Sequence, residues 1–150
     1  MTADSPRRQM ALIIVVVAAA LPVLWWLFPD DGEACGVVRR ADVSSVVGSS
    51  VSAGEKLTDD SRSGASGCGF RTESGAIVSV WIGADGQLDH VFDGMRANGE
   101  LAAGQPEAYV YARVDGESAV TMVDGRVVLV NVPGHLGAAA RLAQLIATSG

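Results

Sequence analysis

The segment AYVYARVDGESAVTMVDGRVVLVNV, residues 108–132, decides the fold because it predicts three consecutive antiparallel strands. It is rich in β-branched and aromatic residues, which is typical of strands. Two Asp-Gly pairs, Asp115-Gly116 and Asp124-Gly125, interrupt it, and this dipeptide favours a hairpin turn with both residues at positive φ. The predicted strands are residues 108–114, 118–123 and 126–132.

A shorter hairpin is predicted upstream, with strands over residues 68–72 and 76–82 joined by Glu73-Ser74-Gly75. Apolar residues alternate along the second of these strands, as expected when one face of a strand is buried. The stretch from residue 49 to 67 is rich in Ser, Gly and Asp. It predicts an irregular loop that leaves room for an edge strand near residues 51–57.

Three amphipathic helices are predicted around these strands. Asp42 caps the first, which ends at Gly48, and Asp85 caps the second, which ends at Asn98-Gly99. The third covers about residues 136–148, where Ala, Leu and Ile form a wide apolar arc. Strands and helices do not alternate regularly, so the sequence predicts an α+β fold. The expected architecture is an antiparallel sheet of about five strands with helices packed on one face.

Cys35 and Cys68 are the two cysteines of the chain. In a reducing compartment they could be buried thiols or half of a metal site, whereas in an exported domain a disulfide is the expected state. A redox-active pair is disfavoured because the chain has no Cys-x-x-Cys motif. We therefore predict one structural disulfide, which contributes roughly 3–4 kcal/mol by the chain-entropy estimate.

The N-terminal segment predicts where the protein resides. Residues 10–28 carry no charge and reach roughly 28 Å as a helix, close to the thickness of the bilayer core. Arg7 and Arg8 precede this segment and acidic residues follow it, so the positive-inside rule leaves the N-terminus cytoplasmic. The predicted organisation is a cytoplasmic N-terminus (1–9), a transmembrane signal-anchor helix (10–28), a linker (29–34) and an extracytoplasmic α+β domain (35–150).

Two alternatives to this single-pass anchor stay open. One is a cleavable signal peptide, although such peptides usually have a shorter apolar region, and the other is a helix buried in the core. Lipidation at Cys35 is disfavoured, because Gly32 stands where a lipoprotein signal needs an apolar residue and Glu33 lies between them.

Composition and motifs argue against several classes of function. The formal net charge is −6 and Lys56 is the only Lys, so the clustered basic patch that nucleic acid requires is missing. His90 and His135 lie outside any hydrolase motif, and Asp89, His90 and Asp93 would supply too few ligands for a metal. No phosphate-binding or dinucleotide motif is found. We therefore expect no catalytic residue, no metal, no cofactor and no enzymatic activity.

One surface feature stands out in the strand after Gln105-Pro106. Tyr109, Tyr111 and Arg113 alternate onto one face of that strand. Tyr and Arg are enriched at protein interfaces, so these three residues are the candidate partner contact. In the alternative interpretation, the Tyr rings only cover the sheet against solvent.

The order of these features resembles a known family. Cys35-Gly36-Val37-Val38 precedes an apolar helix ending in Val46-Val47-Gly48, and Cys68-Gly69-Phe70 opens a strand. A helix, the segment Glu107-Ala108-Tyr109, a Val-rich hairpin and an Ala-rich helix follow. Over residues 35–148 the chain resembles the actinobacterial family of short secreted lipoproteins and membrane-anchored envelope proteins that is catalogued only as a domain of unknown function. It departs from the lipoprotein members by lacking a lipid-accepting Cys, and the family supplies no catalytic residues.

Together these observations predict a membrane-anchored extracytoplasmic envelope protein that is not an enzyme and binds a membrane-associated protein, such as a membrane complex. The linker of residues 29–34 spans at most about 20 Å, which keeps the domain near the membrane. The alternative function is a carrier or sensor of a lipid or small envelope molecule. A flat aromatic patch would favour the partner-binding protein, and an enclosed apolar cavity of several hundred Å³ would favour the carrier.

Overall fold

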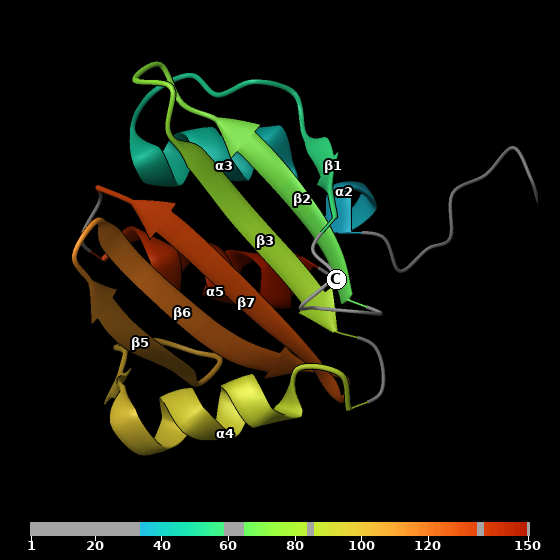
Figure 1. Cartoon of the computed structure of the whole chain (residues 1–150), viewed down its shortest axis with the longest axis vertical. Helices are drawn as coiled ribbons and strands as arrows, with labels where there is room; N and C mark the ends of the chain where they lie inside the picture. The colour runs from blue at the N-terminus through green and yellow to red at the C-terminus, as the bar shows by residue number, and fades with distance from the viewer. Residues whose placement is uncertain (1–33, 59–64, 84–85, 135–136, 150) are drawn as a thin grey trace, which may run out of the picture. The chain divides into compact units, whose positions relative to one another are not determined.

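The computed structural model describes residues 34–58, 65–83, 86–134 and 137–149. The strands are β1 (Glu55–Leu57), β2 (Ala65–Arg71), β3 (Ile77–Gly83), β4 (Glu100–Leu101), β5 (Ala108–Arg113), β6 (Gly116–Val123) and β7 (Arg126–Pro133). The helices are α2 (Ala34–Val37), α3 (Arg40–Val47), α4 (Asp89–Asn98) and α5 (Ala138–Ser149). Within these residues the strands form one antiparallel sheet in the order β1-β2-β3-β7-β6-β5-β4 (Figure 1). The predicted α+β class and antiparallel sheet are confirmed.

The predicted number of about five strands is wrong, because the described residues form a sheet of seven strands. The two additional strands are the edges, β1 and β4. β1 lies where the sequence left room for an edge strand. β4 follows α4 directly and has two residues, Glu100 and Leu101, which pair with Val110 and Tyr109. A strand this short has no alternation to read, so only the neighbouring strand identifies it.

Helices cover both faces of the sheet, which corrects the prediction that they share one face. We call the side that carries Cys68, Val80 and Val130 the major face, because α2, α3 and α5 pack there around one large core (Figure 1). The opposite side, with Trp81 and Leu129, is the minor face, which α4 covers. Neighbouring residues of β3 and β7 are apolar on both sides, as expected for strands buried on both faces.

The helix termini differ in part from the predicted ones. α3 begins at Arg40, so Asp42 lies in its first turn and is not the predicted cap. Gly48 ends α3 as predicted, since it adopts φ 75° and its N–H donates to the Ser44 carbonyl, the usual ending for a helix. α4 ends at Asn98 as predicted, and Asp85 lies outside the described residues.

The two Asp-Gly hairpins have different connections. Asp124 and Gly125 both take positive φ, at 49° and 76°, and Val123 pairs with Arg126, as predicted for this two-residue turn. In the other hairpin Gly116 pairs with Arg113. Gly116 therefore belongs to β6, and the connection is Val114-Asp115, which corrects the predicted turn.

The reason for this shift is a close approach of two strands. A Cβ atom on Gly116 would lie 2.2 Å from the Val132 carbonyl oxygen, so glycine is needed inside the strand and not only in a turn.

The predicted disulfide between Cys35 and Cys68 is confirmed, with 5.0 Å between the two Cα atoms. It joins α2 to β2, and a hydrogen bond of 2.8 Å from the Ala34 N–H to the Ser66 hydroxyl supports the same junction. Residues 10–28, the predicted anchor, lie outside the described residues. None of the helices in the described ranges is long and apolar enough to cross a bilayer.

Candidate functional site

The minor face is only partly covered by α4. Leu88, Val91, Phe92 and Met95 pack from the helix side onto Trp81, Val120 and Leu129. Further along the strands, the same face carries side chains that are exposed or half-buried, apart from the buried Ser118. We call these residues the open patch: Arg71, Ile77, Ser79, Tyr111, Arg113, Ser118 and Asn131.

Three polar side chains form the centre of the open patch. Asn131 of β7 pairs with Ser79 of β3 on one side and with Ser118 of β6 on the other. The Asn131 amide donates to the Ser79 hydroxyl at 3.0 Å, and the Ser118 hydroxyl donates to the Asn131 carbonyl oxygen at 2.5 Å. This ladder holds the amide in one orientation, because its oxygen and its nitrogen each have a partner.

Two largely apolar side chains, Tyr111 and Ile77, lie next to the polar ladder. Tyr111 pairs with Ser118 and is 51% exposed, and Ile77, two residues before Ser79, is 45% exposed. Tyr is among the residue types enriched at protein interfaces, so its exposure here marks a candidate contact.

Two arginines lie one step further along the strands. Arg71 pairs with Ile77, and Arg113 pairs with Gly116. The Arg113 guanidinium lies 3.7 Å from the Asp115 carboxylate, and both side chains are largely exposed. A hollow of about 80 Å³ between Ile77, Arg113 and Pro133 reaches Asn131. The open patch is therefore shallow and suits the surface of another macromolecule better than a small ligand.

The structure separates the three residues that the sequence grouped. The register places Tyr109, Tyr111 and Arg113 on the minor face, but the Tyr109 ring packs edge-to-face on Phe92 of α4, with 5.9 Å between centroids. The Tyr109 hydroxyl donates a hydrogen bond to the Glu107 carboxylate, which raises the pKa of Tyr109 above its ordinary value. Tyr111 and Arg113 thus belong to the open patch, and Tyr109 belongs to the α4 contact.

Sequence reasoning missed the polar ladder. Ser79, Ser118 and Asn131 each interrupt a strand whose other residues are mostly apolar. Polar residues that pair with one another across neighbouring, mostly apolar strands are the feature that could have identified the ladder, once the register was known.

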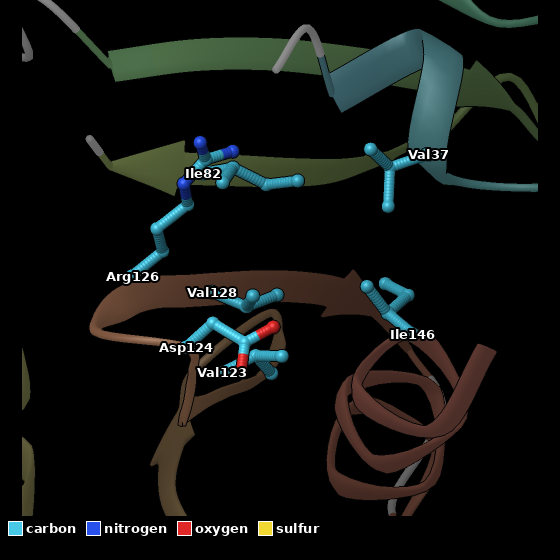
Figure 2. A pocket seen from close by; sticks show the side chains of 7 residues that line it. All are labelled: Val37, Ile82, Val123, Asp124, Arg126, Val128 and Ile146. Atoms are coloured by element: carbon cyan, nitrogen blue, oxygen red, sulfur yellow. The ribbon is translucent and has the colours of Figure 1, made fainter. Parts of the chain in front are cut away.

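A second hollow lies on the major face and has a volume of about 340 Å³. Figure 2 shows its lining, which comes from α2, β3, the β6–β7 hairpin and α5. The residues are Val37, Ile82, Val123, Asp124, Arg126, Val128 and Ile146. Asp124 and Arg126 are exposed, so the hollow opens to solvent and is not the enclosed cavity that would favour a carrier outright.

The remaining chemical candidates do not assemble into a site. Within the described ranges no group of His, Cys, Asp or Glu side chains could hold a metal ion. His90 is exposed on α4, and His135 lies outside the described residues. The buried Glu117 carboxylate accepts a hydrogen bond of 2.9 Å from the Ala139 N–H, so it stabilises the first turn of α5.

No protein-family model, no curated protein and no solved structure matches this chain. The resemblance to the actinobacterial envelope family stays a prediction from the sequence.

Proposed function

We propose that this protein is a non-enzymatic extracytoplasmic protein, anchored in the cell membrane by residues 10–28, that binds a membrane-associated protein through the open patch. The observation that carries the proposal is the combination of Tyr111, Ile77 and Arg113 around a rigid polar ladder. Tyr and Arg are the residue types that most often dominate binding energy at interfaces.

The dimensions of the patch suit a protein surface. It extends from β2 to β5, which is four strand spacings in the order β2-β3-β7-β6-β5, or about 19 Å at about 4.8 Å per spacing. That width is typical of the central part of a small interface, in which a few side chains contribute most of the affinity.

The compartment is inferred from two features. A structural disulfide, here Cys35–Cys68, is typical of an oxidising environment. The uncharged stretch of residues 10–28, with Arg7 and Arg8 before it, favours an anchor that leaves the C-terminal domain outside the cytoplasm. The linker of residues 29–34 then keeps the open patch within reach of proteins in the same membrane.

Site-specific photocrosslinking in native membranes tests the proposal. A photoreactive amino acid at Tyr111 should give a discrete crosslinked protein, whereas the same amino acid at Leu145, which is exposed on α5, should not. Arg113→Ala should reduce the Tyr111 crosslink about tenfold, since Arg is among the residue types that contribute most binding energy at interfaces. Tyr109→Phe keeps the ring contact with Phe92 and should leave the crosslink unchanged. Equal crosslinking from Tyr111 and Leu145 would contradict the proposal.

A further inference from the structure

The hollow on the major face is a second candidate binding site, independent of the open patch because the two lie on opposite faces of the sheet. Five of the seven described side chains that line it are aliphatic. Ile82, Val128 and Ile146 are nearly fully buried, and Val37 and Val123 are partly exposed at its rim. Its volume of about 340 Å³ is at the lower end of ligand pockets, about 300–1,000 Å³. The space therefore suits one alkyl chain.

The mouth of this pocket carries two opposite charges. In Figure 2 the Arg126 side chain extends toward Ile82 of β3, whereas the Asp124 carboxylate lies beside Val123 and Val128. Within the part of the chain that the structure describes, neither Asp124 nor Arg126 makes an ion pair or a side-chain hydrogen bond. Both side chains are exposed and free to contact a ligand.

The β6–β7 turn holds these two charges at the mouth. Asp124 occupies a position with φ 49°, which few residue types other than Gly, Asn and Asp adopt readily. Arg126 pairs with Val123 and projects from the major face. The pocket therefore presents an apolar interior beneath a short carboxylate side chain and a longer guanidinium side chain.

We infer that this pocket binds a single-chain zwitterionic amphiphile, with its alkyl chain among the aliphatic side chains and its head at the two charges. The anionic group of the head pairs with Arg126, and its cationic group pairs with Asp124. A purely anionic head would meet the Asp124 carboxylate and a purely cationic head would meet Arg126, so a head with both signs is the best match. Phospholipids with one acyl chain and a phosphate-ammonium head have this chemistry.

Photolabelling with matched probes tests this inference. The probes share a dodecyl chain with a terminal diazirine and differ in the head, which is phosphocholine, phosphate, trimethylammonium or hydroxyl. The full chain is reconstituted in phosphatidylglycerol vesicles, irradiated and digested, and labelled peptides are quantified relative to the amount of probe in the vesicles. The phosphocholine probe should label the peptides containing Val37, Val128 and Ile146 about fivefold more than the other probes, since each exposed charge pair contributes modestly.

Two conservative variants should change which probe labels the pocket most strongly, one in favour of an anionic head and the other in favour of a cationic head. Asp124→Asn keeps a residue that tolerates positive φ and should make the phosphate probe the strongest. Arg126→Gln should make the trimethylammonium probe the strongest. Asp115→Asn, in the other hairpin, is the matched control and should leave the phosphocholine probe strongest.

A pocket-filling variant tests whether the chain occupies the hollow. Val37→Phe places a ring in the hollow from a partly exposed position and should reduce labelling of Val128 and Ile146 by every probe, while Leu145→Phe should not. The inference would be overturned if all four probes labelled the pocket equally. It would also be overturned if neither charge variant changed which probe labels most strongly, or if labelling survived Val37→Phe. Crosslinking from Tyr111 should be unaffected by Val37→Phe, so failure here is distinguishable from failure of the proposed function.

Discussion

The major face of the sheet carries α2, α3, α5 and the disulfide, whereas the minor face carries α4 over part of its width. The helices on the two faces also differ in how deeply they are buried. α5 buries six of its own residues, but α4 has no buried residue within its bounds, and Leu88 just before it is the buried contact. A helix that is half exposed adds less to stability than one enclosed by a sheet and other helices. The major face therefore contributes most of the stability, and the minor face leaves strand surface accessible for contact.

Removing the disulfide on the major face should have the largest effect on stability. The double variant Cys35→Ala/Cys68→Ala should lower the free energy of unfolding by about 3–4 kcal/mol, because the closed loop no longer restricts the unfolded chain. Urea unfolding followed by circular dichroism measures the change. Reduced wild-type protein should show a similar loss, and a loss below about 1 kcal/mol would mean that α2 is held by packing alone.

A matched pair of buried leucines tests whether the two faces differ in rigidity. Leu142 of α5 and Leu88 before α4 are 0% and 2% exposed. Leu142→Ala should cost about 4 kcal/mol and Leu88→Ala about 2 kcal/mol, because α4 can move to fill the cavity and the enclosed α5 cannot. Urea unfolding of both variants gives the two values. Equal losses would show that the faces are equally rigid.

The helix N-termini allow a smaller comparison. Glu117→Ala removes the buried acceptor of the Ala139 N–H and should cost about 2 kcal/mol. Asp89 lies in the first turn of α4 and is exposed, so Asp89→Ala should cost only about 0.5 kcal/mol. Thermal unfolding at matched pH measures the stability lost by each variant. A larger loss for Asp89→Ala than for Glu117→Ala would be inconsistent with a structural role for Glu117.

A small gain in stability is expected on the minor side. Gly94 lies inside α4, is exposed, and would have free space for a Cβ atom. Gly94→Ala should raise the free energy of unfolding by about 0.5–1 kcal/mol, because alanine favours the helix. The Tyr111 crosslink should not change. A loss of stability would indicate that α4 needs glycine for a reason outside its own backbone.

Much of the sheet could be predicted from the sequence because its signals are local. The β6–β7 hairpin follows from Asp124-Gly125 alone, since few other dipeptides suit two positive φ angles. At Asp115-Gly116 the same reasoning placed the turn one residue late. The position of Gly116 is fixed by its closeness to Val132 across the sheet, and that distance cannot be read from neighbours in the chain.

The face that α4 occupies could not be predicted from its own amphipathic pattern. A stripe of Val91, Phe92 and Met95 shows that one side of the helix is buried, but not against which face of the sheet it packs. The apolar run Val127 to Val130 did contain the information that both faces are covered.

The candidate site was predicted only in part, again because the position of α4 was unknown. Alternation placed Tyr109, Tyr111 and Arg113 together, but only the position of α4 separates Tyr109 from the other two.

The two outermost strands are also the shortest of the described sheet, with three residues in β1 and two in β4. An unpaired strand edge is where sheets of different molecules join and polymerise into fibres. The long strands β3, β6 and β7, with their Val-rich segments, lie inside the sheet, so each is hydrogen-bonded to a strand on both sides. Both edge strands are short and carry charged residues, Glu55 and Lys56 in β1 and Glu100 in β4, and both features oppose the joining of sheet edges between copies of this domain.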